Sequence, residues 1–251
     1  MKAFIFDLDG TLLDTLEDIA SACNAMLAAH KYPAHSVAAY RRLVGNGFGR
    51  LVRGALPPGI GEALAPDRLE ALTAEARAFY GSHMCGCTRP YPGVPEALKE
   101  LARRGFTLAV LSNKPDNFTA GLMPRYFPEI PFALVRGAHP GMPLKPDPAG
   151  PRAMLTELGL EAGQCFYVGD SDVDILTAHN AGMISVGVAW GFRGLAEVRA
   201  AGARYLVDTP DQLPELAACP LREKAAAQGG RDSGRDSAHE ILSDGKFSGE
   251  I

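Results

Sequence analysis

Short apolar runs alternate along the chain with segments in which apolar residues recur at helical spacing. The apolar runs cover residues 3–6, 107–111, 132–135, 165–168, 184–188 and 205–207. Most positions in each run are apolar, which is typical of parallel strands covered by helices on both faces. Helical spacing occurs over 94–101 and 153–158, and a glycine that can end a helix follows each segment. The order of elements predicts a doubly wound α/β fold with a parallel sheet.

The interval between the first two predicted strands follows a different pattern. No convincing strand occurs from about residue 16 to residue 88, but two apolar stripes at helical spacing cover 16–27 and 69–79. This insertion is long enough to form a small core of its own, so we favour a separate domain over helices that merely pack on one domain. We expect an α/β catalytic core made of residues 1–14 and 89–218, with an inserted all-helical cap made of residues 15–88.

The last segment, residues 219–251, loses the apolar periodicity of the rest of the chain. It contains an imperfect repeat, RDSG followed by RDSA, at residues 231–238. This composition is typical of a disordered tail, which we favour over a partner-binding peptide.

Composition and charge exclude several classes of function. The chain is 47% hydrophobic and 22% charged, as is usual for a globular protein, and its formal net charge of -4 is too small to attract nucleic acid. No stretch approaches the ~20 apolar residues that a membrane helix needs. The five cysteines lack the spacing of a metal site or a disulfide framework, which indicates reduced thiols. We expect a cytoplasmic monomer or homodimer without nucleic-acid or membrane partners.

Two carboxylates, Asp7 and Asp9, directly follow the first predicted strand in the stretch FDLDGTL. Open α/β sheets bind ligands beyond the carboxyl ends of their strands, and residues two apart on an extended chain point to the same side. Gly10 allows the chain to turn sharply beside a ligand. Crowded carboxylates repel each other unless a cation lies between them or one is protonated. The pair therefore predicts a site that uses a metal, a transferable proton, or both.

Polar groups also occur at or near the ends of three later predicted strands. Ser112 and Asn113 end the second strand and offer a hydroxyl and turn amides that suit an anion. Lys145 follows the third strand after a loop and supplies a cation. Asp170 ends the fourth strand, and Asp174 lies one helical turn further along. Each has an ordinary structural explanation as a turn, a surface charge or a helix cap, but together they predict one site.

These motifs resemble those of the haloacid dehalogenase superfamily of phosphohydrolases. The matching residues are DLDGTL at 7–12, Ser112, Lys145 and GDSDVD at 169–174, and the resemblance covers essentially residues 1–218. The inserted segment is similar to the cap of the phosphoglycolate phosphatase branch, through VGNG at 44–47 and the residues that follow it. The resemblance implies a Rossmann-like core with an inserted cap, and phosphatase activity.

The resemblance also implies a role for each core residue. Asp7 attacks phosphorus to give an aspartyl-phosphate, and Asp9 protonates the leaving oxygen and then deprotonates the attacking water. Mg²⁺ is bound by oxygens of Asp7, the Asp9 carbonyl and Asp170. Lys145 is the third catalytic residue and neutralises charge on Asp7 and on the phosphoryl oxygens.

The remaining site residues follow from the same resemblance. Four residues are expected to bind phosphate: Thr11, Ser112, Asn113 and Lys145. Asp174 is not expected to bind the metal itself, but to steer a metal-bound water or Lys145. Asn46 is the candidate for substrate selection by the cap, and a cap cation for a substrate carboxylate remains open among Arg41, Arg42, Arg50 and Arg53. Asp172 is additional to the motif, and we expect it to face solvent.

We therefore expect a Mg²⁺-dependent phosphomonoester hydrolase for a small phosphorylated metabolite, with 2-phosphoglycolate as the leading candidate. The alternatives are a sugar phosphomutase, a phosphatase for pyrophosphate, nucleotides or sugar phosphates, and a non-catalytic binding protein. A binding protein would be expected to have lost Asp7 or Lys145, and both are present. The glycine-rich stretch at 45–47 favours a small acid over a whole sugar, since a mutase cap needs several polar sugar contacts.

Overall fold

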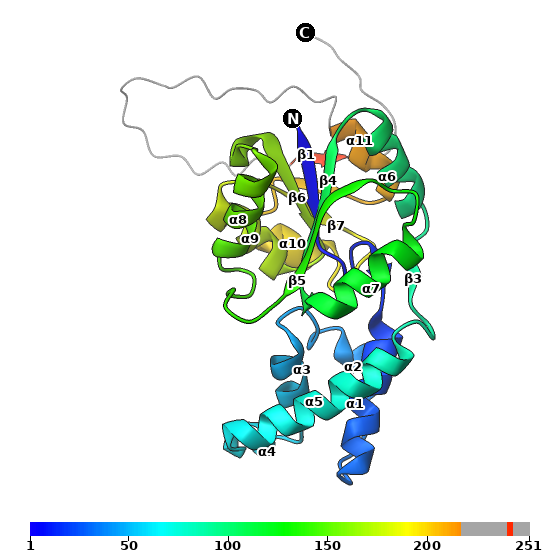
Figure 1. Ribbon diagram of the computed structural model, residues 1–251, viewed down its shortest axis with the longest axis vertical. Coiled ribbons are helices and arrows are strands. Elements are labelled where there is room, and N and C mark those ends of the chain that lie inside the picture. Colours follow the sequence, from blue (N-terminus) through cyan, green and yellow to red (C-terminus); the bar gives the residue numbers. More distant parts are fainter. Residues whose placement is uncertain (217–239, 243–251) are drawn as a thin grey trace, which may run out of the picture.

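A seven-stranded sheet forms the centre of the molecule. The computed structural model describes residues 1–216 and 240–242. The sheet order is β5-β4-β1-β6-β7-β8-β9, and every pairing is parallel. The strands are β1 (Ala3–Phe6), β4 (Thr107–Pro115), β5 (Phe132–Ala138), β6 (Cys165–Gly169), β7 (Ile184–Val188), β8 (Tyr205–Val207) and β9 (Glu240–Leu242). The six predicted strands and the doubly wound parallel order are confirmed (Figure 1).

Helices cover both faces of this sheet. One face packs against α6 (Val94–Arg103), α7 (Asp116–Tyr126) and the short α11 (Leu213–Leu216). The other packs against α8 (Ala149–Leu158), α9 (Asp172–Ala181) and α10 (Leu195–Ala200). Two 3₁₀ turns, Ala162–Gln164 and Pro210–Gln212, complete the connections. Burial on both faces explains why the strand sequences are apolar almost throughout.

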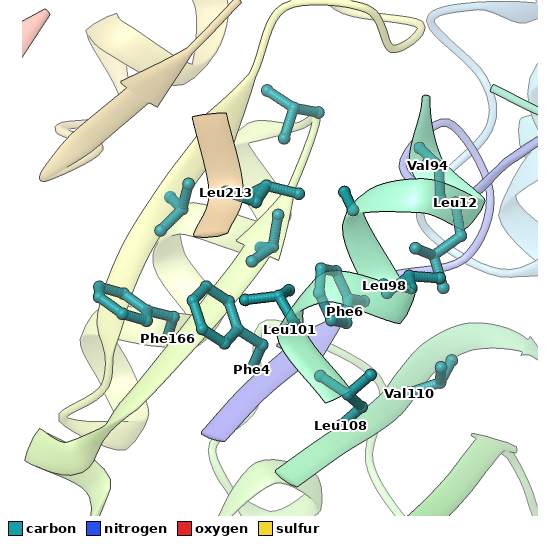
Figure 2. Close-up of a cluster of buried hydrophobic side chains, with 14 of the residues drawn as sticks. Phe4, Phe6, Leu12, Val94, Leu98, Leu101, Leu108, Val110, Phe166 and Leu213 are labelled. Atoms are coloured by element: carbon teal, nitrogen blue, oxygen red, sulfur yellow. The ribbon is translucent and has the colours of Figure 1, made fainter. Parts of the chain in front are cut away.

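The central strand β1 is buried on both faces. Phe4 and Phe6 point to one side, where they pack with Leu98 and Leu101 of α6 (Figure 2). The Phe4 ring centre lies 4.7 Å from that of Phe166 in β6. The residues directly after β1 are consequently carried by a rigid, enclosed element.

The helices within residues 15–88 gather at one end of the molecule (Figure 1). They are α1 (Leu16–Ala29), α2 (Val37–Tyr40), α3 (Phe48–Ala55), α4 (Ile60–Ala63) and α5 (Pro66–His83). α1 and α3 pack against α5, and most of their apolar side chains form a separate hydrophobic cluster. The sequence did not predict the short antiparallel pair of β2 (Leu13–Asp14) with β3 (Arg89–Pro90), where the chain leaves and re-enters the core. We propose that these two crossings bound a cap domain of residues 15–88.

The sequence predicts a disordered tail over residues 219–251, but residues 240–242 form β9 beside β8. The other residues of this segment lie outside the described residues. For the rest of that segment the expectation stays a prediction. Among the helices that the structure describes, none combines the length and the apolar character needed to span a membrane.

Candidate active site

The sheet topology brings the predicted strand-end residues together. After β1 the chain goes to β4 and β5 on one side, and it then returns to β6 on the other side of β1. Such a reversal opens a crevice at the carboxyl end of the central strand. Asp7 directly follows β1, Ser112 lies in β4, and Asp170 directly follows β6. The three residues therefore lie at one edge of the sheet, the edge that faces the helices of residues 15–88.

Asp7, Asp170 and Asp174 form a buried acidic cluster. One carboxylate oxygen from each residue lies within 4.8 Å of the others. Lys145 Nζ lies 2.8 Å from Asp7 Oδ1 and 2.8 Å from Asp174 Oδ1. All four residues are buried. Three carboxylates against one ammonium leave an excess of negative charge where solvent does not screen it, so the cluster needs protons or a further cation.

The pKa values show the same imbalance. Burial raises the pKa of Asp7 to about 6; Lys145 opposes this rise and Asp174 adds to it. The pKa of Asp170 is raised well above its usual range, first by burial and then by the charges of Asp174 and Asp7. A divalent cation among these oxygens would favour the ionised carboxylates.

The donor set fits a hard divalent cation. Asp7 Oδ1 is buried and accepts no hydrogen bond, because Lys145 Nζ approaches it as an ion pair without hydrogen-bond geometry. Carboxylate and carbonyl oxygens are the ligands that Mg²⁺ and Ca²⁺ prefer in proteins. Three carboxylates that share one buried ammonium therefore suit Mg²⁺.

A backbone N–H, a hydroxyl and two glycines enclose the carboxylate of Asp170. The Phe192 N–H donates to Oδ2 at 2.7 Å, and Thr11 Oγ1 donates to Oδ1 at 3.3 Å. A Cβ at Gly10 would lie 2.6 Å from Oδ1, and one at Gly191 would lie 2.2 Å from the Cβ of Asp170. Only glycine permits these close approaches. Asp170 is held in one orientation, and the hydroxyl of Thr11, expected to bind phosphate, is used to hold it.

Asp174 orients Lys145. Ser171 caps α9, and its N–H and hydroxyl donate to Asp174 Oδ2 at 3.1 and 2.7 Å. The other oxygen, Oδ1, accepts a hydrogen bond of 2.8 Å from Lys145 Nζ. This geometry agrees with the expected role of steering Lys145. The structure also brings the Asp174 carboxylate into the acidic cluster, whereas the Asp9 side chain turns elsewhere.

Asp9 is paired with Lys114, a residue for which the sequence pattern predicts no role. Its carboxylate accepts hydrogen bonds from Lys114 Nζ at 2.8 and 3.1 Å and from Thr15 Oγ1 at 2.7 Å. The Lys114 side chain is fully buried, and its ammonium lies 4.5 Å from the ring centre of Tyr80 in α5. Burial lowers the pKa of the Lys114 ammonium, but Asp9 and Tyr80 together outweigh burial and raise this pKa above its usual value. The available signal was its position two residues after Ser112, on the same side of an extended strand end.

Asn113 joins the core to the loop between α2 and α3, residues 41–47, which we call the cap loop. Its Nδ2 donates to the carbonyls of Gly45 at 2.9 Å and Lys145 at 3.0 Å, and its Oδ1 accepts from the Lys145 N–H at 2.8 Å. The side chain expected to bind phosphate therefore positions Lys145. Ser112 Oγ accepts from the Lys114 N–H at 3.3 Å, so its own proton is available to an anion.

Two cavities meet under the cap loop. The smaller, of about 30 Å³, is lined by Asp7, Asp9, Ile19, Val44, Gly45, Gly47, Phe48, Leu51, Ser112, Asn113 and Lys114. This volume holds about one water molecule, so a larger molecule would fit there only after the cap moved. The larger, an open cleft of about 1130 Å³, shares Gly47, Phe48 and Asn113 with it.

Three of the candidate cap residues line the cleft, and the choice among the cap arginines stays a prediction. Asn46, Arg50 and Arg53 line it, whereas Arg41 lines a separate cavity next to Trp190. Asp172, expected to face solvent, is half-buried, and its Oδ1 accepts a hydrogen bond from the Val173 N–H.

Comparison with known proteins agrees with this geometry. Residues 4–188 match the family model described as haloacid dehalogenase-like hydrolase. Phosphoglycolate phosphatase of Vibrio parahaemolyticus is 33% identical over 222 residues, which covers 87% of this chain and 96% of the relative. That of Haemophilus influenzae is 31% identical over 215 residues, covering 84% and 96%. The crystal structure of a predicted phosphoglycolate phosphatase from Haemophilus somnus has a TM-score of 0.79 and 29% identity, covering 86% of this chain and 98% of that one.

Proposed function

We propose that this chain, which belongs to the haloacid dehalogenase-like hydrolase family, is a Mg²⁺-dependent phosphatase that hydrolyses 2-phosphoglycolate through an aspartyl-phosphate. One observation supports the proposal above the others. The Asp7 carboxylate ends the central strand beside Lys145, within a buried cluster whose excess negative charge suits a divalent cation. The sequence is phosphoglycolate phosphatase-like over most of its length.

In this proposal Asp7 attacks phosphorus and Lys145 neutralises charge on the attacking carboxylate and on the phosphoryl oxygens. Mg²⁺, when bound by Asp7, Asp170 and the Asp9 carbonyl, offsets the repulsion between a carboxylate and a phosphate dianion. The Ser112 hydroxyl and nearby backbone N–H groups hold the phosphoryl oxygens during transfer.

Asp9 moves the proton in both halves of the reaction. It gives a proton to the leaving-group oxygen and later takes one from the water that attacks the aspartyl-phosphate. Thr15 and Lys114 hold its carboxylate in one position, 2.7 and 2.8 Å away. A general acid or base must lie within hydrogen-bond distance of the atom to which it gives, or from which it takes, a proton, so a fixed carboxylate suits this role.

The small cavity favours a small, acidic leaving group. Lys114 places a buried ammonium beside Asp9, where the leaving oxygen would lie. In 2-phosphoglycolate the carboxylate is separated from that oxygen by one methylene group, which keeps it close enough to meet Lys114. A whole sugar would have to remain in the open cleft. These contacts support 2-phosphoglycolate over sugar phosphates.

A substrate panel tests the proposal. Phosphate release would be measured from 2-phosphoglycolate, glucose phosphates, nucleoside monophosphates and pyrophosphate, with Mg²⁺ or with EDTA. We expect 2-phosphoglycolate to have the highest kcat/KM and EDTA to abolish turnover. Isomerisation of β-glucose 1-phosphate without phosphate release would favour the mutase, and no reaction with any substrate would favour a binding protein.

Metal affinity is expected to fall as the pH drops below about 6. The pKa of Asp7 is raised to about 6, so below that pH the metal must displace a proton, and its affinity falls about tenfold per pH unit for each proton displaced. The raised pKa also affects folding stability, with a pH dependence opposite in sign to that of a salt-bridged carboxylate, whose pKa is lowered. Without metal, stability is lost as the pH rises from about 3.8 to about 6, since only the folded state keeps this proton.

Calorimetric Mg²⁺ titration between pH 5 and 7.5 measures this effect. Two buffers with different ionisation enthalpies would show proton release directly. An affinity that does not change over this range would contradict a metal site that includes Asp7.

A further inference from the structure

The segment of residues 190–193, which follows β7, contacts the loop after β1 and the acidic cluster together. Trp190 Nε1 donates a hydrogen bond of 2.9 Å to the carbonyl of Thr11. The Phe192 N–H donates one of 2.7 Å to Asp170 Oδ2. Two points of the proposed catalytic machinery are thus held by one short stretch of backbone.

The same segment binds the cap. Arg193 Nη2 donates to the carbonyl of Arg42 at 3.0 Å and to that of Val44 at 2.9 Å, both in the cap loop. A planar guanidinium suits two neighbouring carbonyls better than a flexible ammonium does. Its Nη1 lies 3.5 Å from Glu197 Oε1 in α10, and the Arg193 side chain is only 12% exposed.

Phe192 belongs to both parts of the molecule. Its ring is buried in the hydrophobic cluster of the cap helices, with which Phe118 of α7 also packs. Its backbone N–H holds Asp170. Movement of the cap therefore acts on the residue that fixes this carboxylate.

We propose that segment 190–193 couples closure of the cap loop to the orientation of Asp170, with Arg193 as the positioning residue that holds the loop closed. Opening the cap separates Arg193 from the two carbonyls and withdraws the packing of Phe192, so Asp170 loses a fixed donor. The coupling rests on the proposed function because Asp170 is taken there as a metal ligand. By linkage, metal binding favours the closed cap as much as closure favours metal binding.

The test compares Arg193→Gln with Glu197→Gln in the full chain and without substrate. Mn²⁺ affinity would be measured by electron paramagnetic resonance, and acrylamide quenching of fluorescence would report on Trp190, the single tryptophan of the chain. We expect Arg193→Gln to weaken Mn²⁺ binding by about 5- to 20-fold and to increase quenching, in the range of usual coupling energies. Glu197→Gln removes only the neighbouring ion pair and should stay within about twofold on both measures.

Arg193→Lys should give intermediate values, since one ammonium can still reach a cap-loop carbonyl, and it serves as the test variant if Arg193→Gln does not fold. Unchanged Mn²⁺ affinity in these Arg193 variants, or no Mn²⁺ binding by the wild type, would overturn the coupling. Equal effects of Glu197→Gln would overturn it too, by showing that Arg193 only stabilises α10. If the variants show the coupling but the wild type does not hydrolyse 2-phosphoglycolate, this inference would stand and the proposed substrate would be refuted.

Discussion

Replacing Asp7 with asparagine is expected to lower phosphate release by about 10⁴-fold or more, because an amide cannot form the acyl phosphate on which turnover depends. The change keeps the size of the side chain. It removes one charge from the acidic cluster, where burial already raises the pKa of Asp7 to about 6. The measurement is kcat/KM with 2-phosphoglycolate and Mg²⁺, together with acid-quench trapping of the phosphoprotein.

Thermal unfolding separates loss of the nucleophile from loss of the fold. In EDTA at pH 7.5, Asp7→Asn should unfold at the same temperature as the wild type or higher, since a carboxylate with a raised pKa destabilises the folded state at that pH. Asp172→Asn is the matched control, because Asp172 is half-buried on α9 and outside the acidic cluster. Its kcat/KM should stay within about threefold of the wild type. More than about 1% residual activity in Asp7→Asn would contradict Asp7 as the nucleophile.

The strands and the strand-end residues could be predicted because their signals are local. Residues 165–168 are apolar throughout, and in the structure all of them are buried in β6, which pairs with β1 and β7 and is covered by helices on both faces. A strand that is buried on both faces needs apolar residues at nearly every position, so it is easily recognised in a sequence. Because β4, β1 and β6 are neighbouring parallel strands, Asp7, Ser112 and Asp170 at their carboxyl ends lie at the same edge of the sheet.

The partners of the polar side chains could not be predicted in the same way. Lys114 pairs with Asp9 across 105 positions of sequence, and Arg193 reaches the cap-loop carbonyls across about 150. A lysine at a strand end or an arginine in a loop is most often a solvated charge, so neither residue type points to a buried partner. Thr11 and Asn113 show the converse difficulty. Their hydrogen-bonding groups face the site region but bind Asp170 and the backbone of Lys145.

Replacing Lys114 with methionine is expected to lower kcat/KM for 2-phosphoglycolate by about 10²- to 10³-fold. The substitution removes the ammonium that we place against the substrate carboxylate, and it leaves Asp9 with Thr15 alone. Breaking a buried ion pair from one side commonly costs about 3–5 kcal/mol of stability, so the unfolding temperature should fall as well. Lys114→Arg keeps the charge and should recover part of both losses. Lys99→Met, an exposed lysine paired with Glu129, is the control and should change neither.

Three small substrates distinguish recognition of the leaving group from a general loss of structure. Ethyl phosphate lacks the carboxylate of 2-phosphoglycolate but needs the same proton on its leaving oxygen, whereas acetyl phosphate releases acetate, which needs no proton from Asp9. Lys114→Met should therefore affect 2-phosphoglycolate most, ethyl phosphate less and acetyl phosphate least. The preference for 2-phosphoglycolate over ethyl phosphate should shrink at least about tenfold. An equal loss on all three substrates would mean that Lys114 only stabilises the fold, and the carboxylate would then have to be bound by cap residues in the open cleft, with Arg50 and Arg53 as the next two to replace.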